Sequence, residues 1–388
     1  IVEWKKIYET AKEGLSLVGA DIPLDTITGE LSTADRQIIA IARALLEDAR
    51  LVIMDEPTTA LTHHEVLYLF KTIHALKNQG ISILFVSHKL NEVKEISDRI
   101  LIFRDGKKML DQEAENLDIK TLEYYMTGRK IDKSAVSYSE PGKKSSPLLK
   151  VENLKLSPYF SNVTFELKNN EVLGITGLLG SGRTELALSL FGALPAESGE
   201  IRMESKPVII NTIQDAMRRG IGYVPEDRIK EGLFLEQSIS NNIIVRIIDF
   251  LASKIGIVRN QTNQEIAKNW INKLEIKTPS GDNPVSSLSG GNQQRVVLAK
   301  WLASNPKVLI LNGPTVGVDV GSKAGIHELI RSLAKRGMGI ILISDDIPEL
   351  TQTCNRILLM RKGEITEEFH REEINEEELY QYLIAAKI

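Results

Sequence analysis

Hydrophobic and polar positions along the chain follow one pattern twice. The segment from Leu31 to Gly106 aligns without a gap with the segment from Leu288 to Gly363, at an offset of 257 residues (288 minus 31). In each copy the pattern predicts a capped helix, a buried strand that ends in polar residues, a second helix, and another strand with a polar end. The predicted strands are LVIMDEP and ISILFVS in the first copy, and VLILNGP and IGIILIS in the second.

The second half also contains a glycine-rich loop. Gly177 to Thr184, GLLGSGRT, follows the apolar strand EVLGIT and precedes the helix ELALSLFG. This order matches the phosphate-binding pattern G-x-x-x-x-G-K-[ST], except that Arg183 replaces the lysine. Glycines let backbone N–H groups close around a phosphate, and the helix N-terminus adds partial positive charge. An ordinary glycine turn is the alternative, but the LSGG segment 111 residues downstream (288 minus 177) favours the phosphate loop.

The same spacing applies to the first half. A phosphate loop 111 residues ahead of Leu31 would start near position minus 80 (31 minus 111). We therefore expect that the chain begins inside its first domain, truncated at the N-terminus, and that the first glycine loop is missing. Residues 1–30 predict an amphipathic helix and a loop instead, with Gly14 and Gly19 too far apart to form a phosphate loop.

Composition and charge limit the possible function classes. The 388 residues are 42% apolar and 26% charged, which favours two soluble domains over disorder. A net charge of −4 argues against a general attraction to nucleic acid. The single cysteine, Cys354, cannot form an internal disulfide, which favours a reducing cytosol. No uninterrupted apolar run reaches about 18 residues, so we expect any membrane association to come through a partner protein.

Changes in the pattern divide the chain into domains. We expect a first domain at residues 1–110, a polar linker at 111–147 and a second domain at 148–388. Alternation in LLKVENLKL and VTFELKNNEVLGIT predicts antiparallel strands that lead into the strand before the glycine loop. From Asn211 to about Lys277 the pattern is mostly helical, which predicts a helical subdomain ahead of LSGG.

Together these motifs resemble the tandem nucleotide-binding domains of ATP-binding cassette (ABC) proteins. LS(GG) corresponds to the family's signature, LVIMDEP to its Walker B strand, and His88, after strand ISILFVS, to its switch histidine. The resemblance implies an α/β P-loop NTPase fold with a RecA-like core, an antiparallel β subdomain and a helical signature subdomain. It also implies ATP and Mg²⁺ as cofactors, with hydrolysis at composite sites that the signature of the other half closes.

The first site would combine the first half's Walker B and switch residues with the second signature. The resemblance implies that Asp55 holds Mg²⁺ through water, that Glu56 orients or deprotonates the attacking water, and that His88 contacts the γ-phosphate. The signature residues that would close this site are Ser289, Gly290, Gly291 and Asn292. Taken alone, Asp55 and Glu56 could instead cap a helix, and His88 could be an ordinary exposed histidine. The in-register repeat favours the catalytic interpretation.

A second site would use the glycine loop. Its candidate nucleotide-binding residues are Gly177, Gly180, Ser181, Gly182, Arg183, Thr184 and Glu185. The hydroxyl of Thr184 would reach the Mg²⁺ of bound ATP. Asn312 replaces the Walker B aspartate, Gly313 removes the glutamate, and Asp345 puts a negative charge where the histidine belongs. The signature that would close this site lacks glycines and consists of Ser32, Thr33 and Ala34. We therefore expect nucleotide binding there without hydrolysis.

Within the ABC family, the chain is similar to the ATPases of monosaccharide importers of the ribose, galactose and xylose type. The similarity rests on the arginine-containing glycine loop, YVPEDR at Tyr223 to Arg228, LSGGNQQ, and DEPTTALT at Asp55 to Thr62. In this branch Glu226 takes the place of the glutamine that senses Mg²⁺ and couples to the permease.

The same similarity implies partners and a location. The chain would be peripheral to the membrane, at its cytoplasmic face, and would bind membrane permease subunits and, through them, an extracellular sugar-binding protein. A separately encoded N-terminal segment is a further candidate partner, whereas nucleic acid is not. Leu233, Phe234 and Leu235 have the pattern of exposed apolar residues that would face the permease, with core packing as the alternative.

Other interpretations stay open. One is a soluble tandem cassette that acts on ribosomes, although such proteins generally keep glycine signatures and carboxylate bases in both halves. Another is a truncated remnant that hydrolyses nothing. The asparagine in NGP at 312–314 is also partly similar to autoinducer-uptake relatives. Four histidines lie on predicted helices outside any motif and receive no role: His63, His64, His74 and His327.

Overall fold

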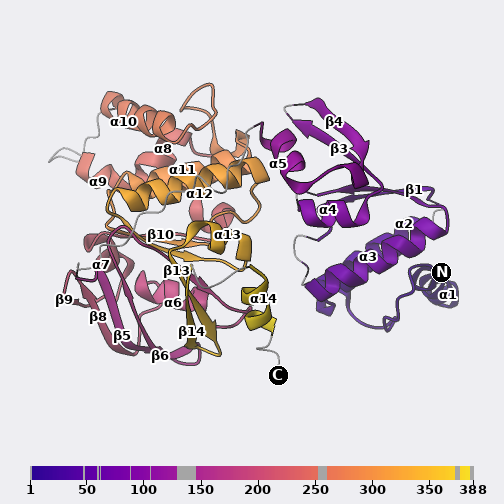
Figure 1. Cartoon of the computed structure of the whole chain (residues 1–388), viewed down its shortest axis with the longest axis horizontal. Helices are drawn as coiled ribbons and strands as arrows, with labels where there is room; N and C mark the ends of the chain where they lie inside the picture. The colour runs from indigo at the N-terminus through magenta and orange to yellow at the C-terminus, as the bar shows by residue number, and fades with distance from the viewer. Residues whose placement is uncertain are drawn as a thin grey trace. The chain divides into compact units, whose positions relative to one another are not determined.

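The computed structural model divides the chain into two compact units. The described residues are 2–46, 49–58, 61, 63–87, 89–104, 106–128, 146–251, 260–371 and 376–384. The first unit spans residues 1–131 and the second residues 132–388, and Figure 1 labels the elements of both. Within the described ranges, no helix is both long and apolar enough to cross a lipid bilayer.

A six-stranded sheet forms the core of the second unit. Its order is β10-β11-β12-β7-β13-β14, with the first five strands parallel and β14 antiparallel to β13. The strands are β7 (Val172–Thr176), β10 (Ile221–Val224), β11 (Val308–Asn312), β12 (Gly339–Ile343), β13 (Arg356–Arg361) and β14 (Glu364–His370). Strands β7, β10, β11 and β12 are buried along their length, which explains their nearly continuous apolar sequences.

An antiparallel sheet in the order β6-β5-β8-β9 precedes and follows the glycine loop in the chain. Its strands are β5 (Leu149–Leu156), β6 (Phe160–Leu167), β8 (Ser198–Met203) and β9 (Lys206–Val208). Leu149 pairs with Leu167, and Leu156 with Phe160, so the antiparallel strands expected ahead of the loop are confirmed. The alternation of buried and exposed positions in β6 fits a sheet that packs on the core through one face.

Helices flank the central sheet of the second unit. They are α6 (Arg183–Leu190), α7 (Ile213–Arg218), α8 (Ile239–Ile244), α9 (Ile248–Leu251), α10 (Asn260–Lys273), α11 (Gly290–Leu302), α12 (Val320–Lys335), α13 (Ile347–Thr353) and α14 (Glu376–Ile384), with short helical turns at η4 (Arg228–Gly232), η5 (Val245–Ile247) and η6 (Val285–Ser287). Helix α11 packs against β10, α12 against β7 and β12, and α6 against β11. The signature helix α11 is thereby fixed to the edge of the sheet.

Residues 211–277 are only partly helical. The expectation is correct for α7, α8 and α10, but residues 221–224 form β10, which pairs in parallel with residues 308–311. The four residues IGYV are too few to show a helical or strand periodicity in the sequence. Their burial and pairing beside β11 make them a strand. The apolar residues that follow divide between core and surface. Leu233 is buried and Leu235 packs against the core, which contradicts their expected exposure, whereas Phe234 is exposed.

The first unit contains two small sheets. Strands β1 and β2 pair in parallel, and β3 and β4 form an antiparallel hairpin. In Figure 1 this hairpin lies on one side of β1, and helix α3 lies on the other. The elements are α1 (Trp4–Leu17), η1 (Thr28–Glu30), α2 (Thr33–Leu45), β1 (Leu51–Asp55), α3 (His63–Asn78), β2 (Ser82–Val86), α4 (Leu90–Ile96), β3 (Arg99–Arg104), β4 (Lys107–Glu113), η2 (Ala114–Asn116) and α5 (Ile119–Thr127).

The internal repeat is present in the fold and extends further than the sequence pattern indicates. From α2 to α5, each helix and strand has a counterpart from α11 to α14 at the offset of 257, so that α5 (119 to 127) corresponds to α14 (376 to 384). The expected linker at 111–147 therefore starts too early. Residues 111–113 complete β4, and α5 packs against β3 and β4. Strand β4 consists mostly of polar residues, with Leu110 as its fully buried position, which obscures its period in the sequence.

A buried ion pair holds the start of β13 to the start of β7. Arg356 Nε lies 2.6 Å from Glu171 Oε1, and both side chains are largely buried. Arg356 also pairs with Glu368, at 2.8 Å, and donates to the carbonyl oxygen of Glu166. The two carboxylates raise the pKa of Arg356, although burial acts in the opposite direction. Removal of one partner would leave a buried charge uncompensated.

We expect Arg356→Ala to destabilise the second unit by about 3–5 kcal/mol, because the buried Glu171 carboxylate loses its partner. Arg99→Ala is the matched control, since Arg99 is the counterpart of Arg356 and is exposed beside Asp111. It should have little effect. Urea unfolding followed by tryptophan fluorescence measures both variants. Equal shifts of the unfolding midpoint would contradict this account of the ion pair.

Candidate nucleotide-binding site

The glycine loop between β7 and α6 is packed against backbone. A side-chain carbon at Gly177 would lie 2.3 Å from the carbonyl oxygen of Met360, and one at Gly182 would lie 2.5 Å from that of Tyr159. Gly182 also has a φ of 92°, in the region that favours glycine. Both glycines are therefore required by the close approach of neighbouring chain segments.

The outer part of the loop is open. Gly180 is exposed, and a side-chain carbon there would meet nothing within 4 Å. Ser181 is buried, and its Oγ has no hydrogen-bond partner among the described residues. Thr184 and Glu185 are half-buried in the first turn of α6. The loop thus offers the open backbone at Gly180, the unsatisfied hydroxyl of Ser181 and the N-terminus of α6. These groups fit the phosphates of a nucleotide.

Arg183 is already engaged within its own unit. Its Nη1 donates to the carbonyl oxygen of Gly177 at 2.6 Å, and its Nη2 lies 3.4 Å from Asp345 Oδ2. Asp345, at the position that corresponds to His88, keeps 76% of its side chain exposed. The carboxylate therefore stands where it competes with a nucleotide phosphate for the arginine, in an ion pair that solvent can open.

Asn312 is buried at the end of β11. Its Nδ2 donates to the hydroxyl of Tyr223 at 3.4 Å. Burial raises the pKa of Tyr223 to about 12, against the smaller lowering effect of that hydrogen bond. Asn312 corresponds to Asp55, which ends β1 on an exposed position. The second unit thus has an amide that contacts a tyrosine where the first has an accessible carboxylate.

The residue directly after Asn312 and the residue directly after Asp55 both have a left-handed backbone. Gly313 has a φ of 54° and Glu56 a φ of 48°. This conformation is easy for glycine but costs a residue with a side chain about 1 kcal/mol or more. At Gly313 an added side-chain carbon would lie 3.0 Å from Cγ of Glu226, so the carboxylate beside the end of β11 comes from residue 226 instead. A glutamate retained at strained position 56 is consistent with a functional carboxylate.

The candidate residues of the first unit lie at the ends of β1 and β2. Asp55 ends β1 opposite Val86 of β2, and the N–H of Glu56 donates to the carbonyl oxygen of Val86 at 2.8 Å. Both acidic residues therefore occupy the carboxyl edge of a parallel pair, where ligands of α/β proteins bind. His88 lies outside the described residues.

The second signature begins helix α11. Ser289 is the N-cap residue, and its Oγ accepts from Asn292 Nδ2 at 3.0 Å. Glycine is needed at the next two positions because a side-chain carbon would lie 2.9 Å from the carbonyl oxygen of Gly317 at Gly290 and 2.5 Å from Cβ of Ser322 at Gly291. In the first unit Ser32 is likewise the N-cap residue of α2, but there its Oγ accepts from the backbone N–H of Asp35.

Arg228 links the signature helix to the loop after β11, which the sequence pattern did not reveal. Its guanidinium donates to the carbonyl oxygens of Val316, at 2.7 Å, and Gly317, at 3.0 Å, and lies 3.4 Å from Gln293 Oε1 of α11. Its place at the end of YVPEDR is the available sequence signal. Arg228 therefore holds helix α11 and the loop after β11 close to each other.

A buried threonine and glutamate pair recurs in both units and was also missed. In the second unit Glu349 accepts from Thr315 at 2.9 Å and from Ser344 at 2.6 Å, and it lies 3.1 Å from Nε2 of His327. In the first unit, the corresponding Thr58 donates to Glu92. Each pair connects the segment after the Walker B strand to the helix after the switch position. His327 thus has a structural contact, although no nucleotide role follows from it.

Tyr159 is a further residue that the sequence pattern did not single out. It is exposed, and its carbonyl oxygen lies against Gly182 in the glycine loop. An exposed aromatic ring beside a phosphate loop is suited to stacking on a nucleobase. Its signal in the sequence is weak because it sits in the SPY turn between two antiparallel strands.

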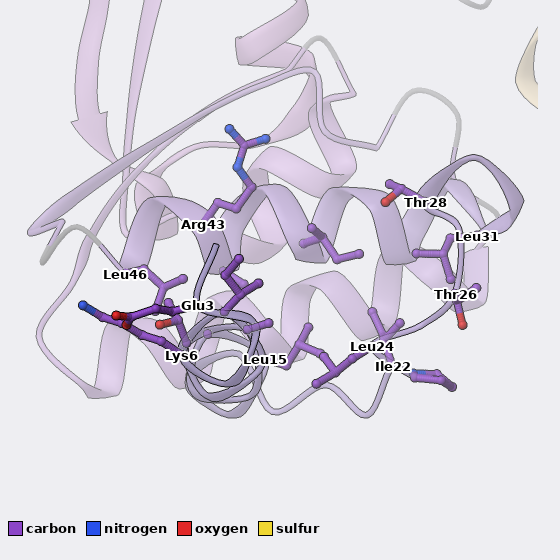
Figure 2. A pocket seen from close by; sticks show the side chains of 17 residues that line it. Glu3, Lys6, Leu15, Ile22, Leu24, Thr26, Thr28, Leu31, Arg43 and Leu46 are labelled. Carbon is purple, nitrogen blue, oxygen red and sulfur yellow. The ribbon is translucent and has the colours of Figure 1, made fainter. Parts of the chain in front are cut away.

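A separate pocket of about 540 Å³ lies in the first unit, between α1, the loop that follows it, and α2. Figure 2 shows Leu15 of α1, Ile22 and Leu24 of the following loop, Arg43 of α2, and Leu46 directly after that helix, around it. Its lining is mainly apolar, without the convergent polar groups that a nucleotide phosphate requires.

The described residues hold no ready-made metal site. No group of three or more His, Cys, Asp or Glu side chains among them is arranged to bind a metal ion. Thr184 in the second unit and Asp55 in the first remain the candidate oxygen ligands for Mg²⁺.

These features define an ATP-binding cassette, and comparisons with known proteins agree. The family model for ABC transporters matches residues 4–59 and 160–316. The chain belongs to the ABC transporter family, as an ATPase homologous to sugar-import ATP-binding proteins.

Two relatives show the extent of the similarity. The ribose import ATP-binding protein RbsA of Caldanaerobacter subterraneus subsp. tengcongensis is 40% identical over 380 residues, which cover 97% of this chain and 76% of that protein. RbsA of Clostridium perfringens strain 13 is 40% identical over 375 residues, which cover 97% of this chain and 74% of that protein.

Solved structures agree with the fold. A nucleotide-free ATP-binding cassette from an ABC transporter matches with a TM-score of 0.55 at 21% identity, over 63% of this chain and 99% of that one. The cbiO1 protein of Clostridium perfringens, part of the ABC transporter complex cbiONQ, matches with a TM-score of 0.52 at 24% identity, over 63% of this chain and 94% of that one.

We expect Asp345→Asn to strengthen ATP binding by about two- to fivefold, because an exposed competing carboxylate is removed from Arg183. ADP binding should change less, since ADP lacks the γ-phosphate. Displacement of a fluorescent nucleotide measures both affinities, and added salt should reduce the difference. Asp346→Asn is the control, because Asp346 pairs with Lys323 instead. An equal gain for ATP and ADP would contradict the proposed competition.

Proposed function

We propose that this protein is the ATP-binding subunit of an importer that uses ATP to drive uptake of a monosaccharide through a separate permease. Its similarity to ribose import ATP-binding proteins over nearly the whole chain carries the proposal. The relatives are importer subunits, which favours this function over a cassette that acts on ribosomes. Import of sugar by cells that depend on this chain tests it directly.

The two halves of the protein would have different tasks. Asp55 and Glu56 supply the carboxylates of the hydrolytic half, with Asp55 toward the Mg²⁺ of ATP and Glu56 toward the attacking water. His88 would contact the γ-phosphate, and the signature from Ser289 to Asn292 would close that site. Support for the catalytic role of Glu56 comes from its strained left-handed backbone, which the second half avoids with glycine.

The glycine loop of the second half would bind nucleotide without hydrolysis. Gly177 to Glu185 would receive the phosphates, and Tyr159 would stack on the base. Asn312 and Gly313 offer no carboxylate for the metal or the attacking water. Arg183 keeps a positive charge, but its planar guanidinium is not equivalent to a lysine ammonium in a tight loop. Bound nucleotide would then have a structural role in the second half.

The partners follow from the importer function. The chain would bind permease subunits at the cytoplasmic face of the membrane, and through them an extracellular sugar-binding protein. Glu226, the candidate coupling residue, is exposed beside the end of β11. Ile229 and Phe234 are exposed on the segment that follows and supply apolar contact area toward the permease.

The purified 388-residue chain should show no steady-state ATPase activity. The glycine loop lies in the second half, where Asn312 and Gly313 stand in place of the two acidic residues. The candidate carboxylate base, Glu56, lies in the first half, so the loop and the base belong to different halves. Loss of either set of contacts costs several kcal/mol of transition-state stabilisation, about 3–4 kcal/mol for one donor. Phosphate release over hours measures the activity. A rate above background that Glu56→Gln abolishes would contradict this expectation.

Cysteines placed at Glu231 and Glu236 should cross-link to the permease in membranes that contain both proteins. Both positions are exposed and flank Phe234. A cysteine at Lys206, exposed on β9 of the same unit, is the control and should not react with the permease. Mass spectrometry identifies the linked peptides. Labelling of ribosomal proteins in place of a membrane subunit would support the soluble-cassette alternative.

A further inference from the structure

The loop after β11 is held from two sides in the second unit. On one side, the guanidinium of Arg228 donates to the carbonyl oxygens of Val316 and Gly317, at 2.7 and 3.0 Å. On the other side, the hydroxyl of Thr315 donates to the carboxylate of Glu349 at 2.9 Å. Thr315 and Glu349 are both buried, which strengthens this hydrogen bond. A shift of the loop therefore changes the contacts on both sides.

Glu349 extends the connection to the switch position. Its other carboxylate oxygen, Oε2, accepts from the hydroxyl of Ser344 at 2.6 Å. Ser344 directly precedes Asp345, and its Oγ accepts at 3.0 Å from the backbone N–H of Asp346, which directly follows Asp345. His327 Nε2, from α12, lies 3.1 Å from Oε1 of the same glutamate. One buried carboxylate thus fixes the residues on both sides of Asp345 through the hydroxyl of Ser344.

Asp345 itself makes a contact that can take two states. Its Oδ2 lies 3.4 Å from Nη2 of Arg183, and 76% of its side chain is exposed. An ion pair of this kind opens at little cost, so a phosphate in the glycine loop can take Arg183 from the carboxylate. Coupling between distant sites requires an element with two discrete arrangements. The pair of Arg183 and Asp345 is such an element.

The corresponding glutamate of the first unit has a different set of partners. Glu92 accepts from Thr58, as Glu349 accepts from Thr315, but it also lies 3.2 Å from Nζ of Lys89. Lys89 occupies the position that corresponds to Asp346. The threonine and glutamate pair is therefore common to both units, whereas the further contacts of each glutamate are specific to its unit.

We propose that Thr315, Glu349 and Ser344 form a relay of positioning residues that couples nucleotide binding at the glycine loop to residues 228–235. When a bound phosphate releases Arg183 from Asp345, the switch loop loosens. The change reaches Arg228 through the relay and the loop after β11. The inference rests on the proposed function for nucleotide binding by the glycine loop, and it gives the second half a regulatory task in place of hydrolysis.

The first test is a double-mutant cycle on ATP affinity, measured in the full chain by displacement of a fluorescent nucleotide. Ser344→Ala removes the hydroxyl that holds the switch loop. ATP binding should therefore strengthen by about two- to fivefold, as for Asp345→Asn. When Asp345→Asn is already present, Ser344→Ala should change the affinity no further. Ser332→Ala is the control, because the hydroxyl of Ser332 donates within α12 to the carbonyl oxygen of Leu329.

A merely structural role of Ser344 predicts the same effect with and without Asp345→Asn. That result, or an unchanged affinity in the single Ser344→Ala variant, would overturn the proposal. The substitution leaves Thr315 and His327 beside the buried carboxylate of Glu349, so the second unit should still fold.

The second test measures hydrogen exchange of the backbone amides of residues 228–235 in the full chain, with and without ATP. ATP should alter the exchange in the unsubstituted chain. Thr315→Val should abolish the alteration, because valine is close to threonine in shape but cannot donate to Glu349. Thr366→Val is the control on β14 and should leave the alteration intact, since the hydroxyl of Thr366 contacts the carbonyl oxygen of Leu359.

Exchange that ATP leaves unchanged, or an alteration that survives Thr315→Val, would overturn the relay. Absence of nucleotide binding at the glycine loop would overturn both the relay and the proposed task of the second half. Binding without coupling would overturn the relay alone. The two failures are therefore distinguishable, and neither readout uses ATP hydrolysis or transport.

Discussion

The parallel pairing of β7 between β12 and β13 is the constraint on which the second unit depends. Because β7 is buried on both faces and bonded along both edges, its carboxyl end has a fixed position in the sheet. The glycine loop therefore opens at the edge where β11 ends in Asn312 and β12 leads into Asp345. The 3.4 Å contact between Arg183 and Asp345 follows from this arrangement of strand ends, since the two residues lie far apart in the chain.

The two units show how one backbone supports different chemistry. Helices and strands recur at a constant offset, and the left-handed backbone at Glu56 recurs at Gly313. The side chains at the strand ends do not recur. The first unit presents an exposed aspartate and a glutamate in a strained conformation, whereas the second has a buried asparagine bonded to Tyr223 and a glycine beside Glu226. Backbone geometry has thus been kept while the groups that would act on a phosphate have changed.

The site residues that the sequence pattern missed act through contacts between distant segments. Arg228 joins the signature helix to the loop after β11, and Glu349 joins that loop to the helix after the switch position. Tyr159 contacts the glycine loop from a turn between antiparallel strands. Apart from the place of Arg228 at the end of YVPEDR, no neighbour in the sequence reveals their roles. Motif reasoning identifies residues whose chemistry depends on local spacing, such as the glycine loop, but not those that depend on tertiary contact.

The amino-acid sequence by itself determined the repeat, the α/β class, the glycine loop and the acidic pair at Asp55 and Glu56, because these depend on periodicity and on short spacings along the chain. Only the tertiary structure decided that residues 221–224 form a strand, that α5 belongs to the first unit, and that Leu233 is buried. It also decided that Arg183 is paired with Asp345. These outcomes depend on which distant residues become neighbours, and burial beside those neighbours overrides local preference.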